Sequence, residues 1–258
     1  MTDCQEQLNQ KRLYITFKLN IMIRRIASLA FIAVLALFYG CKSYQESKSN
    51  SHPVNKQEQQ ALTPDEVLNE FKKGSERFRT SNVTIRNHSE SIRKVATDGQ
   101  YPKAIVLSCV DSRVPVEDVF DQGIGDVFVG RVAGNFVNTD LLGSMEFACK
   151  VAGAKLIIVM GHQHCGAIKG AIDDVKLGNI TSMLQNIKPA VVMSQNFEGE
   201  KSSKNEAFVK TVSQNNVRNA IAQIRAKSEI LRTMEEKGEI KIVGAFYVLR
   251  TGDLEFLK

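Results

Sequence analysis

The segment "KAIVLSCVDSRVP" at residues 103–115 joins an apolar run directly to a thiol, a carboxylate and a guanidinium. The run is short and continuous rather than alternating, which is typical of a strand that is covered on both faces. Cys109, Asp111 and Arg113 follow on alternate positions, just where this strand is expected to end. A core strand has no use for two charges at its end, and a surface loop has no use for a lone thiol. Taken alone, Asp111 and Arg113 would be a surface salt bridge, so the reason for the pattern has to come from the rest of the sequence.

Other apolar runs share the character of the first and are found at 126–132 ("DVFVGRV"), 155–160 ("KLIIVM") and 240–249 ("IKIVGAFYVL"). Helical patterns at 141–153 and 205–237 lie between them. Strands that alternate with helices form βαβ units and a parallel sheet. We therefore expect one α/β domain over residues 62–258, with a mostly parallel central β-sheet flanked by helices.

The first helix of this domain is expected to begin after Thr63, a good N-cap residue that is followed by Pro64 and by Glu66. This combination forms a capping box with proline at the first helical position. A weaker helical pattern covers 89–97, and the polar, Ser- and Asn-rich stretch at 194–204 predicts an exposed loop.

An uncharged stretch at residues 26–40 follows two arginines and precedes Cys41. It is shorter than the roughly 20 residues that cross a bilayer. A charged start, a short apolar region and a small residue before the cleavage point are typical of a secretory signal. With Gly40 before Cys41, the segment resembles a bacterial lipoprotein signal, whose cysteine is lipidated; an uncleaved N-terminal anchor is the alternative.

The chain is thereby divided into a leader with a signal peptide at residues 1–40, a flexible polar tether at 41–61 and the α/β domain at 62–258. The arrangement also favours Met22 as the true start. The tether has too few aliphatic residues to order itself. We expect the protein to be anchored to a membrane of the cell envelope by lipid on Cys41, with its domain facing the periplasm or exterior. If the leader is not a signal, we expect a cytoplasmic protein.

The 258 residues are 43% hydrophobic and 24% charged, which is ordinary for a folded domain. The net charge of +6 is partly an effect of the leader. Five of the 34 basic and two of the 28 acidic residues fall within residues 1–40, which leaves 29 against 26 for the rest. This weak excess, without a basic stripe, gives no argument for a nucleic-acid partner.

Cys109, His162 and Cys165 carry the sulfur and nitrogen atoms that bind zinc. Cys109 follows the first predicted strand and "GHQHCG" at 161–166 follows the third, so both lie where sites form in open parallel sheets. Three protein ligands leave a fourth position open, as in catalytic zinc sites. Residue types and spacing leave a second interpretation open, because a cysteine at a strand end is often a small core residue.

The two motifs together resemble the signatures of the β-class carbonic anhydrases, Cys-x-Asp-Ser-Arg and His-x-x-Cys. The bacterial branch of this family is also similar in four further segments: "GSERF" at 74–78, "DQGIGDVFVGRVAGN" at 121–135, "GSMEFA" at 143–148 and "GAFYVLRTGDLEFL" at 244–257. The likeness spans essentially residues 63–257. It implies a β-carbonic-anhydrase fold and the zinc-dependent, reversible hydration of carbon dioxide to bicarbonate and a proton.

The resemblance also implies residue roles. One zinc ion per subunit would be bound by Cys109, His162 and Cys165. Asp111 and Arg113 would form a catalytic pair, in which the carboxylate orients zinc-bound hydroxide and the guanidinium holds the carboxylate ionised. Backbone N–H groups around Gly166 would support the substrate oxygens. Family members are homodimers or dimers of dimers, and an apolar helix face with Phe71 and Phe78 agrees with such an interface.

Alternatives remain at this point. A protein of the same fold could hydrolyse carbonyl sulfide or carbon disulfide, because specificity depends on pocket shape rather than on the ligands. A non-catalytic zinc-binding lipoprotein is the alternative from another class. His164 either transfers protons, since imidazole titrates near neutrality, or is a supporting or exposed residue. Cys149 falls in an apolar helical pattern and is expected in the core.

Overall fold

The computed structural model describes residues 53–84 and 87–257, so the predicted signal peptide and Cys41 lie outside the described residues. The elements follow one another along the chain as α2 (Lys56–Ala61), α3 (Pro64–Arg79), α4 (Glu90–Thr97), β1 (Ala104–Ser108), α5 (Val116–Val119), β2 (Val127–Arg131), α6 (Thr139–Glu146), the π-helical turn η1 (Phe147–Val151), β3 (Leu156–His162), α7 (Gly166–Ile172), α8 (Gly178–Gln185), α9 (Lys188–Met193), α10 (Glu206–Lys227), α11 (Glu229–Glu236), β4 (Lys241–Tyr247) and β5 (Leu254–Leu257).

The five strands form one sheet in the order β2-β1-β3-β4-β5. The first four strands are mutually parallel, and β5 runs antiparallel to β4 at one edge. This confirms the predicted α/β architecture with a mostly parallel sheet. Because β1 and β3 are neighbours in parallel register, their carboxyl ends lie at the same edge of the sheet.

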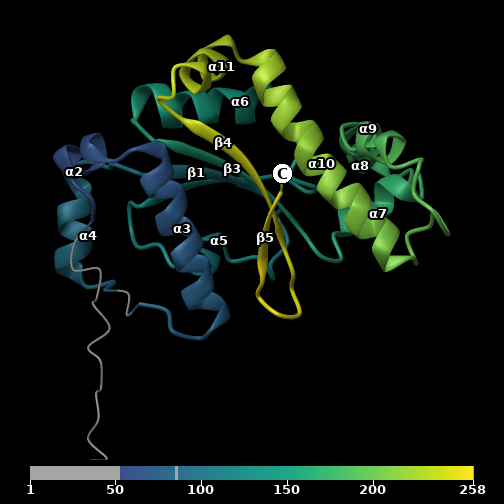
Figure 1. The fold of residues 1–258 in the computed structure, drawn as a ribbon, viewed down its shortest axis with the longest axis horizontal. Coiled ribbons are helices and arrows are strands. Elements are labelled where there is room, and N and C mark those ends of the chain that lie inside the picture. The colour runs from purple at the N-terminus through teal and green to yellow at the C-terminus, as the bar shows by residue number, and fades with distance from the viewer. Residues whose placement is uncertain (1–52, 85–86, 258) are drawn as a thin grey trace, which may run out of the picture. The chain divides into compact units, whose positions relative to one another are not determined.

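Successive side chains of a strand point to opposite faces, and helices cover both faces of this sheet (Figure 1). Ile105, Leu107, Ile157 and Val159 pack in one core with residues of α6, α10 and α11. Val106, Ile158 and Met160 pack in a second core with residues of α3 and α5. The continuous apolar runs seen in the sequence are explained by these two cores.

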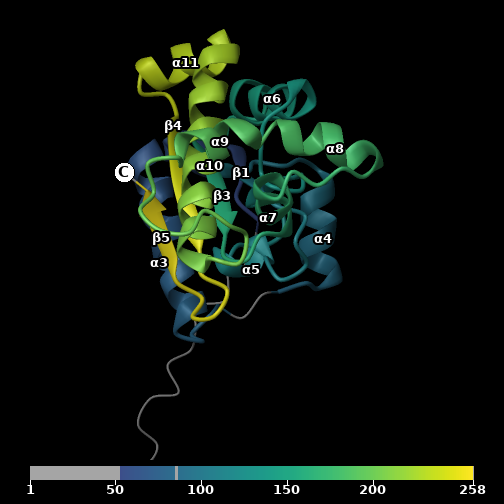
Figure 2. The same ribbon diagram turned by 90° about the vertical axis from the view of Figure 1, so that its right-hand side faces the viewer.

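A third apolar cluster joins α7, α8 and α9 to the N-terminal part of α10. These three short helices gather at the right of Figure 1, and the turned view of Figure 2 shows them beside α10 as well. The cluster includes Cys109 and Cys165, both buried. The third cluster therefore packs against the carboxyl end of β1.

The first residues of the helices lie close to the positions predicted from the sequence. Thr63 caps α3 in a complete capping box with Glu66, as predicted, and α4 begins at Glu90, one residue later than the predicted start. The predicted helix over 205–237 is divided in two at Ser228, which adopts an extended backbone conformation. The Ser228 hydroxyl accepts the N–H of Leu231 and starts a new helix, which is the physical reason for the break.

Helix α2 lies within the last residues of the segment expected to be a flexible tether. Its residue Gln59 is buried and donates hydrogen bonds to the carbonyl oxygens of Pro102 and Ala152, at 2.7 and 2.8 Å. A buried amide that satisfies two backbone acceptors attaches the helix to the domain. The folded domain thus includes residues N-terminal of residue 62 that were expected to belong to the tether.

The apolar face of α3 packs within its own domain rather than remaining open for a partner. Phe71 is fully buried, with its ring centroid 5.2 Å from that of Phe120. Phe78 contacts Tyr247 at a centroid distance of 6.3 Å. Phe71 is therefore not available to a partner, whereas Phe78 is half-buried and its part in an interface stays a prediction.

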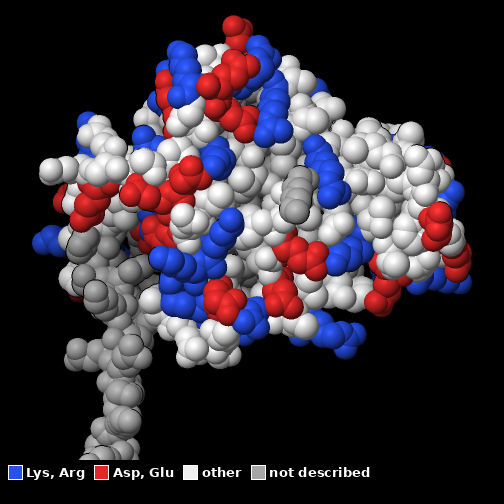
Figure 3. Space-filling view, in the orientation of Figure 1, with Lys and Arg blue, Asp and Glu red and all other residues white. Residues whose placement is uncertain are grey.

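Charged side chains of both signs are interspersed over the face shown in Figure 3. Several basic residues have acidic partners within 3 Å, among them Lys210 with Glu255 and Arg225 with Glu235. Among the described helices, none is long and apolar enough to cross a membrane.

Candidate metal centre

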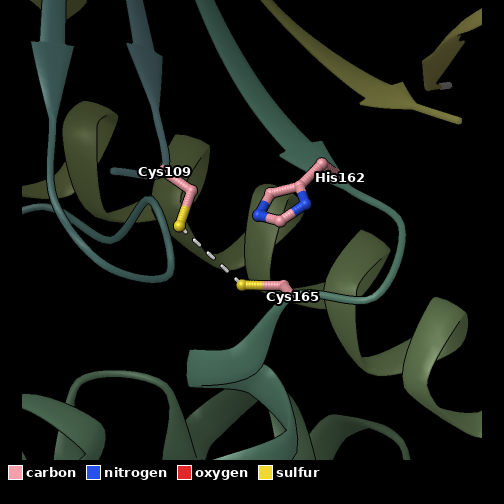
Figure 4. Close-up of side chains that lie close together, drawn as sticks. All are labelled: Cys109, His162 and Cys165. Carbon is pink, nitrogen blue, oxygen red and sulfur yellow. Dashed lines mark hydrogen bonds between the residues drawn. The ribbon is translucent and has the colours of Figure 1, made fainter. Parts of the chain in front are cut away.

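Three side chains meet at the carboxyl edge of the sheet (Figure 4). Cys109 directly follows β1, His162 is the last residue of β3, and Cys165 is the N-cap residue of α7. The parallel pairing of β1 with β3 brings the first two together although they are far apart in sequence. The tight turn after β3 returns Cys165 to the same point. The predicted ligands thus converge.

The spacing of these groups suits a zinc ion. One sulfur or nitrogen atom from each residue lies within 4.8 Å of the other two, and all three residues are buried. The two sulfur atoms are 4.0 Å apart. Two thiolates bound at about 2.3 Å in tetrahedral geometry would be separated by about 3.8 Å. The sulfur pair therefore needs little movement to bind zinc.

His162 is prepared to act as a ligand through its Nε2 atom. Its Nδ1 lies 2.9 Å from the carbonyl oxygen of Gln163, which can only accept, so Nδ1 carries the proton. Nε2 then presents a lone pair, and this buried atom has no hydrogen-bond partner among the described residues. A metal-binding histidine is commonly oriented by such a hydrogen bond from its other nitrogen, so the orphaned nitrogen fits a metal ligand.

The two thiols influence one another strongly. The hydrogen bond from the Cys165 thiol lowers the pKa of Cys109, and the resulting thiolate, together with burial, raises the pKa of Cys165. The two shifts favour a thiolate at Cys109 and a thiol at Cys165. Cys149, by contrast, is buried in the core as predicted, and burial raises its pKa to about 12.

Asp111 and Arg113 form the predicted pair beside this cluster. The Arg113 guanidinium donates from Nε to Oδ1 at 2.9 Å and from Nη2 to Oδ2 at 2.7 Å, and its backbone N–H also donates to Oδ1. These bonds hold the pKa of Asp111 at about 2. Asp111 Oδ2 lies 3.8 Å from His162 Nε2. An ionised, oriented carboxylate therefore stands next to a metal ligand.

Two residues that the sequence did not single out support the loop after β1. Arg131, at the end of β2, donates to the carbonyl oxygens of Cys109 and Val114, at 3.0 and 2.8 Å, and so holds both ends of the loop that carries Asp111. The backbone N–H of Gly134 donates to Cys109 Sγ at 3.3 Å. Their only signal in the sequence was the similarity of the segment "DQGIGDVFVGRVAGN" to the family.

Gly166 and His164 flank Cys165 but differ in surroundings. Gly166 is exposed at the start of α7, and a Cβ atom placed there would meet nothing within 4 Å. His164 has a backbone φ of 56° and its Nε2 lies 3.9 Å from Glu206 Oε1. His164 and Glu206 line part of a pocket of about 190 Å³, which Lys210 also borders. The structure thus places His164 outside the ligand set, as the motif spacing predicts.

Comparison with known proteins agrees with this geometry. Residues 104–254 match the family model described as carbonic anhydrase. The chain is 34% identical over 187 residues to carbonic anhydrase 2 of Mycobacterium tuberculosis, an alignment that covers 70% of this chain and 87% of the relative. The chain belongs to the β-class carbonic anhydrases.

Solved β-carbonic anhydrases share the fold. The enzyme of Coccomyxa superposes with a TM-score of 0.58 at 24% identity, over 74% of this chain and 84% of that one. A β-carbonic anhydrase of Sordaria macrospora, described as tetrameric, gives a TM-score of 0.56 at 24% identity, over 62% and 83%. In this β-class carbonic anhydrase, Cys109, His162 and Cys165 form the zinc site typical of the family.

Proposed function

We propose that the protein catalyses the reversible hydration of carbon dioxide to bicarbonate and a proton. The observation that carries the proposal is the position of the Asp111 carboxylate, 3.8 Å from the ligand nitrogen of His162 and fixed by Arg113. A site built only to store metal would have no use for an oriented carboxylate beside the ligands.

When bound, zinc supplies a Lewis acid that lowers the pKa of a water molecule to about 7 and so provides a nucleophile near neutral pH. Asp111, ionised at that pH, would accept a hydrogen bond from such a water molecule and orient it toward the substrate. Arg113 keeps the carboxylate from rotating, because both oxygens are engaged by its guanidinium.

Apolar packing surrounds two of the ligands. Cys109 and Cys165 belong to a buried apolar cluster with Phe136 and Ile168. Carbon dioxide carries no charge and needs no ion partner to enter such a site. The open space beside Gly166 leaves room for backbone N–H groups at the start of α7 to support the developing bicarbonate oxygens.

Carbonyl sulfide and carbon disulfide are linear substrates that the same groups could attack. Stopped-flow assays of the zinc-loaded protein with each of the three gases distinguish these activities. We expect turnover of carbon dioxide far above the buffer rate. Hydration at the buffer rate, together with turnover of a sulfur-containing gas, would overturn the proposal in favour of the alternative hydrolase.

We also propose a homodimer, alone or paired into a tetramer, with an interface at the free edge of β2. Strand β2 is an edge strand whose residues are half-buried or exposed. Beside it, Phe147 is 49% exposed and contacts Phe128, and Val151 is 71% exposed. Light scattering is expected to give a multiple of the monomer mass, and Phe147→Glu is expected to lower it. A monomeric wild-type protein would overturn this proposal.

The location of the enzyme is a proposal that rests on the sequence of residues 22–41 alone. We propose that Cys41 is lipidated after signal cleavage and that the polar residues after it connect the domain to the cell envelope. Several acyl chains anchor a protein firmly, whereas one binds only marginally. Cys41→Ser is expected to release the protein from the membrane fraction without changing its specific activity. Wild-type protein in the cytosol that retains residues 22–40 would contradict export.

A further inference from the structure

An asparagine on α10, Asn216, reaches toward the metal centre from the helix layer. Its side chain is fully buried, and its Nδ2 donates a 2.7 Å hydrogen bond to the carbonyl oxygen of Gly134, which is 82 positions away in the chain. The Oδ1 atom of the same amide has no hydrogen-bond partner among the described residues. Burying an acceptor without a hydrogen bond destabilises the folded state. The stabilising contact of this amide is therefore the hydrogen bond that its Nδ2 donates to Gly134.

Gly134 connects this amide to a zinc ligand. The carbonyl of Gly134 accepts from Asn216, while its N–H donates to Cys109 Sγ at 3.3 Å. Gly134 has a φ of 83°, and a Cβ atom there would lie 2.4 Å from Ile187 Cδ1. Only glycine fits between these neighbours in this conformation. The hydrogen bond from Asn216 therefore holds a residue whose N–H donates to the sulfur.

Close packing also fixes the distance of α10 from the sheet. Val217, next to Asn216, lies against Gly161 of β3 and Gly244 of β4, where Cβ atoms would come within 2.9 and 2.8 Å of its methyl groups. Two glycines thus allow the helix to approach the sheet closely. The Asn216 amide is consequently presented to Gly134 from a rigid element rather than from a loop.

We propose that Asn216 is a positioning residue of the zinc centre. By holding the Gly134 carbonyl, it directs the Gly134 N–H at Cys109 Sγ. A hydrogen bond to a thiolate fixes the sulfur and withdraws negative charge from it, which adjusts its strength as a metal ligand. The inference rests on the zinc site within the proposed function and not on the identity of the substrate.

The test uses two variants and a matched control. Asn216→Ala removes the amide, and Asn216→Leu removes it while filling the space. Asn215→Ala deletes the neighbouring amide, which donates to Ser194 Oγ at 2.9 Å and has no such link to Cys109. Each variant is loaded with Co²⁺, whose sulfur-to-metal charge-transfer absorption reports thiolate charge, and its zinc affinity is measured by competition with a chelator.

Both Asn216 variants are expected to bind zinc roughly 10-fold more weakly and to shift the charge-transfer band to longer wavelength, because the sulfur regains electron density. Asn215→Ala should match the wild type in both measurements. The proposal would be overturned if either folded Asn216 variant had the spectrum and zinc affinity of the wild type. It would also be overturned if the substitutions lowered the melting temperature of the metal-free protein and left metal binding unchanged. Neither readout depends on turnover, so a protein inactive toward carbon dioxide could still confirm this role.

Discussion

Arg113 engages both carboxylate oxygens of Asp111, with Nε 2.9 Å from Oδ1 and Nη2 2.7 Å from Oδ2. The backbone N–H of Arg113 adds a third hydrogen bond, as in turns where an aspartate accepts from the residue two positions on. The short spacing of the two residues is therefore a structural requirement. It produces a carboxylate that is both ionised and fixed in direction next to His162.

Replacing Asp111 by Asn should separate metal binding from turnover. Asn cannot accept a hydrogen bond through both terminal atoms, so the attacking water loses its orienting partner. We expect one zinc per subunit to be retained and carbon dioxide hydration to fall by on the order of 10²-fold or more. Metal analysis and stopped-flow assays give the two quantities. Ser112→Ala, an exposed neighbour in the same loop, is the control, and full activity in Asp111→Asn would refute the assigned role.

The Asp111–Arg113 pair should also make stability depend on pH in the acidic range. The pKa of Asp111 is lowered to about 2, chiefly by the hydrogen bonds of the Arg113 side chain. An unfolded aspartate has a pKa of about 3.9. The stabilisation is therefore complete above that value and is lost as the pH falls from about 4 through 2.

Urea unfolding at pH 6 and at pH 3 checks this prediction. The wild type should lose more unfolding free energy between the two pH values than Arg113→Leu, in which the pKa of Asp111 returns toward its ordinary value. Equal losses in the two proteins would show that the pair does not carry the effect.

Zinc binding should release about one proton at neutral pH. The hydrogen bond from Cys165 lowers the pKa of Cys109 and favours its thiolate, whereas the pKa of Cys165 is raised. Zinc binds both sulfurs as thiolates, so only the proton of Cys165 has to leave. Two independent thiols, with ordinary pKa values near 8.5, would release nearly two. Calorimetric titrations in buffers of different ionisation enthalpy measure the number, and a value near two would contradict the coupling.

Gln59 should contribute to the stability of the whole domain although it lies in the segment expected to be a tether. Gln59→Ala leaves the carbonyl oxygens of Pro102 and Ala152 without this donor. We expect the free energy of unfolding to fall by about 1–3 kcal/mol. Gln60→Ala, its exposed neighbour in α2, should change it little. An equal effect of the two substitutions in chemical denaturation would argue against docking through Gln59.

Local patterns were sufficient to predict the four parallel strands, whereas the ligand triad was settled only by the resemblance to a known family. Continuous apolar runs mark strands that are covered on both faces, and β1, β2 and β4 occur where the runs do. The end of β3 was placed too early, since Gly161 and His162 still pair with Phe246 and Tyr247. Pairing with a neighbouring strand, which the run itself does not encode, extends β3 to the metal ligand.

Contacts between distant residues could not be predicted in the same way. Arg131 reaches Cys109 across 22 positions and Asn216 reaches Gly134 across 82, and neither residue shows a local pattern. Helices α7, α8 and α9 each have eight residues or fewer, too short for a clear period. Gln59 looked like one more polar residue of a tether, because burial of a single amide leaves no mark on composition.

The most direct test of the account is the rate of carbon dioxide hydration, measured by stopped flow in one sample as isolated, after removal of zinc and after zinc is restored. The zinc centre of Cys109, His162 and Cys165 predicts rapid hydration in the loaded protein, the buffer rate after zinc removal, and recovery at one zinc per subunit. Hydration at the buffer rate in fully loaded, folded protein, or activity that persists without zinc, would contradict the account.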